Sequence, residues 1–371
     1  MAGLALQAER MLVEVDFKLS EPWRNGPEAA AEKVVLAELP GMATVTLSRI
    51  TSHIRFDWRW NGVKGVGGLS AIYPEISEAG RHRLVFELDP AEGVFNGALD
   101  GVAFRRGDTR VPPWRMGVLP APAEVKKGPL TEAVVIRPGR LTPRPEPAPE
   151  ELDLTPRRGR LIYRNEFASF ASCAGWRMEG PGVVEFAGGE LKMQPRDLNA
   201  PDAHFVYWCP EIFPADFLAE WTFVPESRYG LAIVFFAARG VKGEPVLAPG
   251  LAPRHGVFTQ YTQGDVAAYH ISYYANTPED PGRMTTNLRK NPGFCLLSNG
   301  PAPLQYGDNR PHRVRLLKER GHIVMTVDGR KIIDYNDNGG FGKVWRDGSF
   351  GFRQMARSVM RYSDFSVYEL K

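Results

Sequence analysis

The sequence predicts an all-β protein made of two antiparallel β-sandwiches, the second of jelly-roll type, joined by a proline-rich linker. Three observations lead to this prediction. Short runs rich in Val, Ile, Phe, Tyr and Trp alternate apolar with polar residues in both halves, which is typical of half-buried strands. Gly, Asn, Asp and Pro separate most of these runs, and helical periodicity is nearly absent. From residue 119 to 158 the strand pattern gives way to proline, as in PRPEPAPEELDLTP.

The 371 residues suit two domains of about 100–200 residues each. We expect an N-terminal accessory sandwich over 1–118, the linker over 119–158 and a second sandwich over 159–371. In the first part, MLVEVDFKL, MATVTLSRI, HIRFDWRW and HRLVFELD alternate in a way that is similar to laminin-G-like modules. An alanine-rich stretch around Glu28 to Leu39 hints at one short helix.

The clearest strand signal lies between His312 and Tyr335. There, strand, turn, strand, turn and strand follow in immediate succession. Asp328-Gly329 supplies the second turn, because this dipeptide readily adopts the positive φ that tight hairpins need. Many short strands of this kind predict two packed sheets.

Composition excludes several classes of partner. The 46 Lys and Arg residues nearly balance the 43 Asp and Glu residues, so the charge does not suggest a nucleic-acid partner. No apolar run approaches the ~20 residues of a membrane helix, so no membrane partner is expected. The start MAGLALQAERML lacks the features of a secretion signal, and we expect a cytoplasmic protein unless a signal peptide has been removed.

Metal and cofactor motifs are also missing. Cys173, Cys209 and Cys295 show no metal-ligand spacing and are expected to be reduced thiols. The seven histidines form no H-x-H or H-E-x-x-H pattern. GVKGVGG, at 62–68, lacks the ending of a phosphate-binding loop. We therefore expect no cofactor, although a structural calcium held by oxygen ligands would leave little trace in the sequence.

Motifs across the second half resemble the YesU-like family of bacterial proteins, which have a galectin-like or concanavalin A-like sandwich fold. The matching segments, in family order, include LIYRN (161–165), WRMEG (176–180), AHFVYWCPE (203–211), GLAIVFFAARG (230–240), GEPVLAP (243–249), HISY (270–273), NLRK (287–290) and GFRQM (351–355). The resemblance implies a link to the breakdown of rhamnogalacturonan-type polysaccharides. It names no reaction, because this fold includes lectins, hydrolases and lyases.

Strand parity places candidate catalytic groups on one face. His270, Ser272 and Tyr274 share a face of their strand, and Asn287 and Arg289 share a face of theirs. These groups suit β-elimination of a uronic acid. Arg289 and Asn287 would neutralise the sugar carboxylate, and His270 would remove the adjacent C–H proton.

Other residues complete the predicted site. Tyr261, or Tyr274, would protonate the leaving oxygen, and Trp208 would stack on a sugar ring. The residues expected to bind substrate are Trp208, Glu211, Asp265, Ser272, Tyr274, Lys290, Arg353 and Gln354.

We thus expect a carbohydrate-active protein that binds an acidic oligosaccharide or polysaccharide and cleaves it by β-elimination. Two alternatives stay open. A glycoside hydrolase would use a carboxylate pair that includes Glu211 or Asp265, but no E-x-D-x-E alternation supports it. A non-catalytic, lectin-like module would only hold the sugar, and its strand residues would then be ordinary polar groups.

Overall fold

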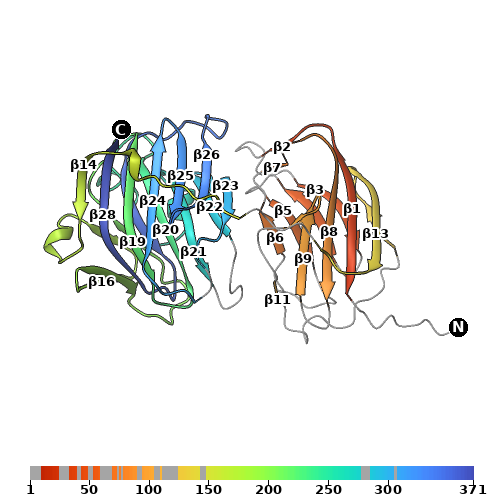
Figure 1. The fold of residues 1–371 in the computed structure, drawn as a ribbon, viewed down its shortest axis with the longest axis horizontal. Helices are drawn as coiled ribbons and strands as arrows, with labels where there is room; N and C mark the ends of the chain where they lie inside the picture. Colours follow the sequence, from red (N-terminus) through yellow and green to blue (C-terminus); the bar gives the residue numbers. More distant parts are fainter. Residues whose placement is uncertain are drawn as a thin grey trace. The chain divides into compact units, whose positions relative to one another are not determined.

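The computed structural model describes residues 10–24, 33–39, 43–48, 53–58, 69–72, 75–76, 78–89, 94–103, 109–110, 124–142, 148–276, 285–304 and 307–371. The chain divides into two compact units, Met1–Ala148 and Pro149–Lys371. Strands make up nearly all the regular structure of the described residues (Figure 1), which confirms the all-β prediction. None of the described helices is long and apolar enough to cross a membrane.

The first unit contains two main sheets around a core of its own. Phe17, Leu47 and Phe86 are among the side chains that fill this core. The six-stranded sheet has the order β10 (Val102–Ala103), β9 (Val94–Leu99), β8 (Gly80–Asp89), β1 (Met11–Leu19) and β13 (Thr131–Pro138), with β11 (Thr109–Arg110) paired to β9. The five-stranded sheet has the order β12 (Lys126–Lys127), β3 (Lys33–Leu39), β4 (Ala43–Ser48), β5 (His53–Trp58) and β6 (Leu69–Ile72), and β2 (Trp23–Arg24) pairs with β7 (Glu75–Ile76).

The second unit is a larger sandwich of an eight-stranded and a seven-stranded sheet. The eight-stranded sheet has the order β16 (Gly182–Ala187), β17 (Glu190–Pro195), β28 (Met360–Leu370), β19 (Phe217–Pro225), β24 (His312–Glu319), β25 (His322–Val327) and β26 (Arg330–Asn336), with β14 (Arg158–Asn165) paired to β28. The seven-stranded sheet has the order β15 (Arg177–Glu179), β18 (Phe205–Trp208), β27 (Ser349–Gln354), β20 (Gly230–Gly240), β21 (Val266–Asn276), β22 (Thr285–Asn291) and β23 (Cys295–Pro301).

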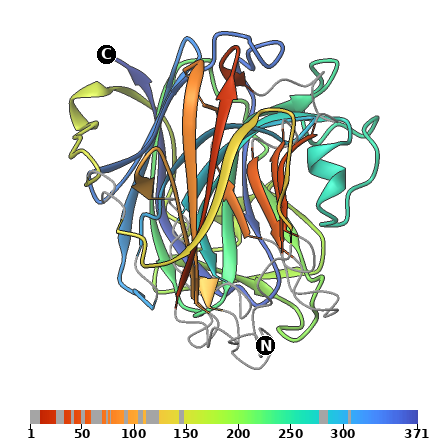
Figure 2. The ribbon, with the colours of Figure 1, turned by 90° about the vertical axis from the view of Figure 1, so that its right-hand side faces the viewer.

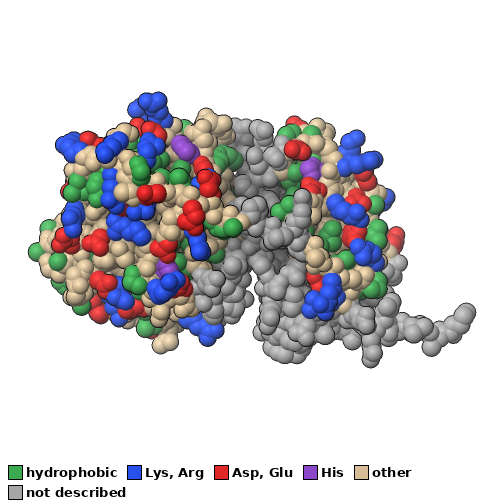
Figure 3. Space-filling view, viewed as in Figure 1, with side chains coloured by type: hydrophobic (Ala, Val, Ile, Leu, Met, Phe, Trp, Pro, Cys, Tyr) green, Lys and Arg blue, Asp and Glu red, His purple; other side chains and the backbone are tan. Residues whose placement is uncertain are grey.

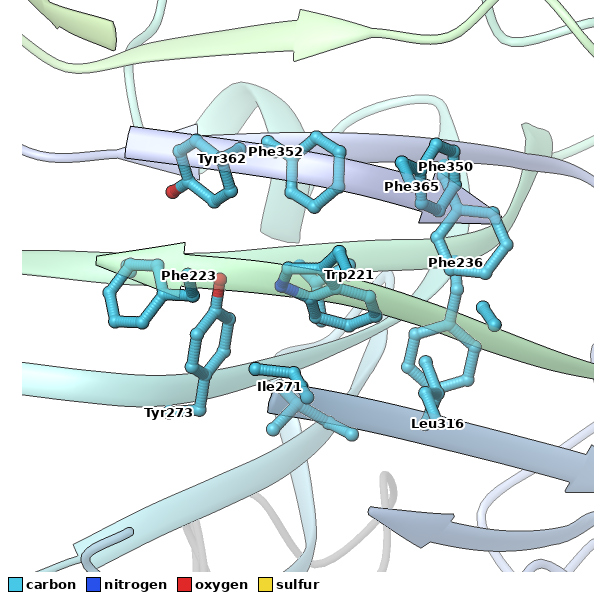
Figure 4. Packing of buried hydrophobic residues seen from close by; sticks show 14 of the residues in the cluster. Trp221, Phe223, Phe236, Ile271, Tyr273, Leu316, Phe350, Phe352, Tyr362 and Phe365 are labelled. Atoms are coloured by element: carbon cyan, nitrogen blue, oxygen red, sulfur yellow. The ribbon is translucent and has the colours of Figure 1, made fainter. Parts of the chain in front are cut away.

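Aromatic side chains from both sheets form the core of the second unit. Trp221 lies in the middle of the cluster shown in Figure 4, with its ring centroid 5.7 Å from that of Phe352. Phe236, Ile271 and Phe365 belong to the same buried cluster. Each such side chain contributes about 1.5–3 kcal/mol when it leaves water, so this cluster supplies the main force that holds the sheets together.

The two units repeat one strand order. The order β10-β9-β8-β1-β13 in the first unit corresponds to β26-β25-β24-β19-β28 in the second. The order β12-β3-β4-β5-β6 likewise corresponds to β27-β20-β21-β22-β23. These strands also follow one another along the chain in the same sequence, and the second unit adds β14 to β18 before its copy begins.

A side-chain contact repeats with the strands. In the first unit, His82 Nδ1 lies 2.9 Å from Asp100 Oδ2, and in the second, His312 Nδ1 lies 2.7 Å from Asp328 Oδ2. Both aspartates have a φ of 51° and precede a glycine of positive φ. Each also accepts the backbone N–H of the residue after its histidine, at 2.8 Å. The two units therefore form a tandem structural repeat.

The structure corrects the boundaries expected from the proline-rich segment. Within 119–158, β13 pairs with β1 and β12 pairs with β3, so both strands belong to the first unit. At the other end, Leu154 is buried against the eight-stranded sheet. Proline dominates the composition of this segment and hid the alternation of TEAVVIRP, which is an ordinary strand pattern.

The short helix predicted around Glu28 to Leu39 is also wrong for the part of that stretch that the structure describes. Lys33–Leu39 forms β3, because Leu36 and Leu39 fill the core between the sheets. The preceding residues 28–32 and the glycine-rich 62–68 lie outside the described residues.

Candidate functional site

The outer face of the seven-stranded sheet, opposite the core, carries the candidate site. Strand pairing arranges its residues in two neighbouring rows. The first row is Glu179, Val206, Arg353, Ile233, Ser272, Asn287 and Asn299. The second row is Arg177, Trp208, Gly351, Phe235, His270, Arg289 and Leu296. The structure thus brings His270, Ser272, Asn287 and Arg289 together, as parity predicted.

A covering segment, defined here as residues 241–265, lies over part of this face. Its short helix α1 (Thr259–Thr262) is seen at the periphery of the strands in Figure 2. Val246 and Tyr261 of the segment pack with Phe235 and Trp208 of the sheet in one apolar cluster. The outer face is therefore a second, smaller core with polar groups inside it.

Arg353 is the most unusual of these polar groups. Its side chain is fully buried, and its Nη2 donates to the carbonyl of Gly256 at 3.0 Å. Its Nε and Nη1 have no hydrogen-bond partner, and no carboxylate of the described residues lies within ion-pair distance. The guanidinium carbon lies 4.9 Å from the ring centre of Tyr261 and 5.6 Å from that of Phe258. Burial lowers the pKa of Arg353 to about 10, so the group stays charged.

His270 lies close to this cation and is buried as well. Its Nδ1 is 2.7 Å from Asn291 Nδ2, which donates to it, so the proton of the neutral ring lies on Nε2. Burial lowers the pKa of His270 well below its usual value, and the charges of Arg289 and Arg353 lower it further. In this arrangement the imidazole is a hydrogen-bond donor, because its one accepting nitrogen is occupied.

Arg289 is held by an aromatic ring. Its guanidinium carbon lies 3.8 Å from the ring centre of Phe294, and its Nη1 donates to the Phe294 carbonyl at 3.0 Å. Such a cation–π contact keeps a buried guanidinium in a fixed orientation.

Glu179 connects the covering segment to the edge of the sheet. Its Oε2 accepts from Trp208 Nε1 at 2.9 Å, from the Tyr261 hydroxyl at 3.0 Å and from Arg254 Nε at 3.0 Å. Its Oε1 accepts from Arg254 Nη2 at 2.8 Å. Burial and the Glu179 charge raise the pKa of Tyr261 well above its usual value. The hydroxyl proton of Tyr261 is therefore held by Glu179, and Trp208, which is fully buried, offers no exposed ring for a sugar.

Arg254 is the residue that the sequence analysis missed. It stands in an irregular loop with no strand pattern to place it, 75 positions from its partner Glu179. The predicted Asp265 lies nearby, with its Oδ1 3.7 Å from Arg254 Nη1, and accepts the Ala252 N–H at 2.7 Å. Glu179 and Asp265 thus hold the covering segment in place through their contacts with Arg254 and with the Ala252 N–H.

Three predicted substrate-binding residues lie on the core side of the sheet instead: Tyr274, Lys290 and Gln354. Tyr274 was expected beside Ser272, but the register shifts between Ala232 and Ile233, and this β-bulge turns its ring into the core. Lys290 makes a buried ion pair with Asp337, at 2.8 Å.

Gln354 and Glu211 also lie away from the predicted site. Gln354 is buried on the core side, where its Nε2 donates to the Tyr362 hydroxyl at 3.1 Å. It shares strand parity with Phe352, so the alternation itself assigns it to the core. Glu211 is exposed beyond the end of β18, outside both rows.

Clusters of metal-ligating side chains are absent from the described ranges. No three His, Cys, Asp or Glu residues there come together as a metal site requires. The expectation of no cofactor, with a structural calcium left open, stays a prediction.

The second unit is a β-sandwich with a galectin-like fold, and similarity to known proteins assigns its family. The chain belongs to the family described as a domain of unknown function, DUF1961, which matches residues 160–367. The uncharacterized protein YesU of Bacillus subtilis (strain 168) is 37% identical over 217 residues, or 57% of this chain and 97% of YesU. These matches confirm the resemblance found in the sequence.

Solved structures agree on the fold. A protein of unknown function with a galectin-like fold from Bacillus subtilis is 36% identical, with a TM-score of 0.54, covering 58% of this chain and 98% of its own. The carbohydrate binding module CBM66 from Bacillus subtilis is 12% identical with a TM-score of 0.35, covering 53% and 96%, and is too distant to inform function.

Proposed function

We propose that the second unit binds an acidic carbohydrate on the outer face of its seven-stranded sheet, with a sugar carboxylate as the counterion of Arg353. The observation that carries this proposal is the buried guanidinium whose Nε and Nη1 lack partners. An unpaired buried charge costs several kcal/mol, and a carboxylate offsets that cost by supplying the opposite charge and accepting an N–H bond from Nε or Nη1. A neutral sugar supplies no such charge.

Other groups beside Arg353 support an acidic ligand. His270 presents its Nε2–H, and Arg289 lies opposite it on the neighbouring strand. All three side chains are buried, so a ligand reaches them only when the covering segment shifts. The contact that competes with the ligand is the Gly256 carbonyl, the one acceptor that Arg353 has.

β-Elimination is the second candidate function, and the pairing of His270 with Arg289 favours it. A base needs a free lone pair on the imidazole. The Asn291 amide would have to turn so that its Oδ1, which has no partner, accepts the proton of Nδ1. Nε2 would then face the ligand as an acceptor. Tyr261 is a weak candidate for the acid, because Glu179 already holds its proton.

Titration calorimetry with an oligogalacturonate and its methyl ester tests the binding proposal. We expect the acid to bind and the ester to bind at least about tenfold more weakly, because esterification removes the charge but keeps the ring. Arg353→Met should abolish binding of the acid at this site. Arg310→Met, which changes an exposed arginine, is the matched control. Equal affinity for acid and ester, or an unchanged affinity in Arg353→Met, would refute the proposal.

The same mixtures separate binding from elimination. Elimination creates a conjugated double bond, so ultraviolet absorbance rises with time, and His270→Gln should stop that rise. Binding without any rise in absorbance identifies a lectin-like module.

A further inference from the structure

A cavity of about 260 Å³ lies at one end of the seven-stranded sheet and is separate from the site of Arg353. We call it the rim pocket. Ala237 and Ala267 form part of its wall, and Ala237 belongs to the core cluster, so the pocket opens on the core side of the sheet. Arg353 faces the opposite side. The side chains that matter here are Arg239, Lys242, Lys343, Trp345, Arg346 and Asp347.

The rim pocket collects positive charge. On the face of the second unit seen in Figure 3, acidic and basic side chains are mixed. The pocket instead has four cations and one carboxylate, and that carboxylate, Asp347, is paired with Arg239. Lys242, Lys343 and Arg346 form no ion pair with the residues that the structure describes. An anion entering the pocket therefore meets an excess of positive charge, which Asp347 and the neighbouring Glu244 offset only in part.

Buried groups hold the loop that carries Trp345. The indole Nε1 donates to the Asn291 carbonyl at 3.0 Å, and the Trp345 backbone N–H donates to the Tyr269 hydroxyl at 3.1 Å. Lys290 Nζ donates to the Gly342 carbonyl and Lys318 Nζ to the Arg346 carbonyl, each at 2.9 Å. Both lysines are almost completely buried. An aromatic ring fixed in this way binds a sugar face at little cost in conformational entropy.

We propose that the rim pocket is a second binding site, for one sugar residue that carries a negative charge. The volume is below the ~300–1,000 Å³ of sites for drug-sized ligands, so it suits one ring rather than a chain of them. Trp345 would contact the apolar face of the ring, and the three cations would bind the charged substituent. A uronate carboxylate and a sugar phosphate share this chemistry.

Calorimetry of the full chain with galacturonate, galactose 6-phosphate and galactose tests the pocket. The measurements are made in wild type and in Arg353→Met, which removes the first site. Binding to the rim pocket can then be detected whether or not the first site binds sugar. We expect one charged sugar per chain in Arg353→Met and much weaker binding of galactose. Whether the uronate or the phosphate binds more tightly identifies the source of the charge.

Two double variants locate the binding. Lys343→Gln with Arg346→Gln should weaken it at least about tenfold. Arg330→Gln with Lys371→Gln removes two exposed charges elsewhere and should leave the affinity unchanged. Trp345→Leu tests the aromatic contact, with near-ultraviolet circular dichroism as a check on folding. Equal losses in both double variants, or equal affinity for galactose, would overturn the proposal.

Discussion

His270 lies directly opposite Arg289 on the adjacent strands β21 and β22, and both side chains are buried on the outer face of the sheet. Burial and two nearby guanidinium groups keep the imidazole neutral. An acidic sugar can accept the Nε2–H of that neutral ring, whereas removal of a proton from the sugar requires the ring proton to lie on Nδ1 instead.

The pH dependence of stability should report on His270. Its pKa is lowered on folding, so at low pH the unfolded chain binds a proton that the folded protein does not. The free energy of unfolding should therefore fall as the pH drops below about 6.5, the unfolded value. Urea unfolding from pH 8 to pH 5 measures this, and His270→Gln should flatten the profile. An unchanged profile in that variant would contradict the assignment, and His255→Gln, at an exposed position, is the control.

Arg353→Met should stabilise the protein while it removes the binding site. The substitution replaces a buried, unpaired charge by an apolar side chain of similar length, which we expect to raise the free energy of unfolding by about 1 kcal/mol. Thermal and urea unfolding measure the gain. A loss of stability would mean that the stacking on Tyr261 and the bond to Gly256 outweigh the cost of burying the charge.

Glu179→Gln should destabilise the second unit by about 3 kcal/mol, because it leaves the buried Arg254 with only the more distant Asp265, at 3.7 Å, as a counterion. Adding Arg254→Met should recover much of that loss, and a double-mutant cycle in urea measures the coupling between the two. Glu211→Gln, at an exposed position, should change stability by less than about 0.5 kcal/mol. Absence of coupling would show that the covering segment is held by other contacts.

Because of Lys318, the free energy of unfolding should be higher in mildly alkaline solution than at neutral pH. Burial lowers its pKa to about 8, whereas an unfolded lysine titrates near 10.5. Between these values the unfolded chain binds the extra proton, so stability rises with pH by up to about 3 kcal/mol. Lys318→Met should remove this rise, which urea unfolding at pH 7 and pH 10 can detect. A rise of the same size in the variant would assign it to another group.

Local pattern predicts the parts of the site that depend on strand parity. His270, Ser272, Asn287 and Arg289 share a face because alternation along a strand is local, and the two strands pair in the register that this requires. The predicted face of Tyr274 is wrong because a β-bulge adds one residue to β21. No turn residue in the sequence indicates this bulge.

Contacts over long sequence separations explain what could not be predicted. Arg254 reaches Glu179 through a loop whose path depends on the finished fold. The tandem repeat did leave a signal that could have been read, since a His-Arg pair precedes an Asp-Gly turn in each unit. Without the strand order, two such pairs are too common to indicate a repeat.

The shared strand order has a consequence for synthesis of the chain. In each unit the last strand pairs with an early one: β13 with β1, and β28 with β19. The first unit can complete its sheet once Pro138 has left the ribosome. The second keeps an open edge along β19 until the eleven residues of β28 have been synthesised. In each unit, the strands between these two partners must therefore be synthesised before the sheet can be completed.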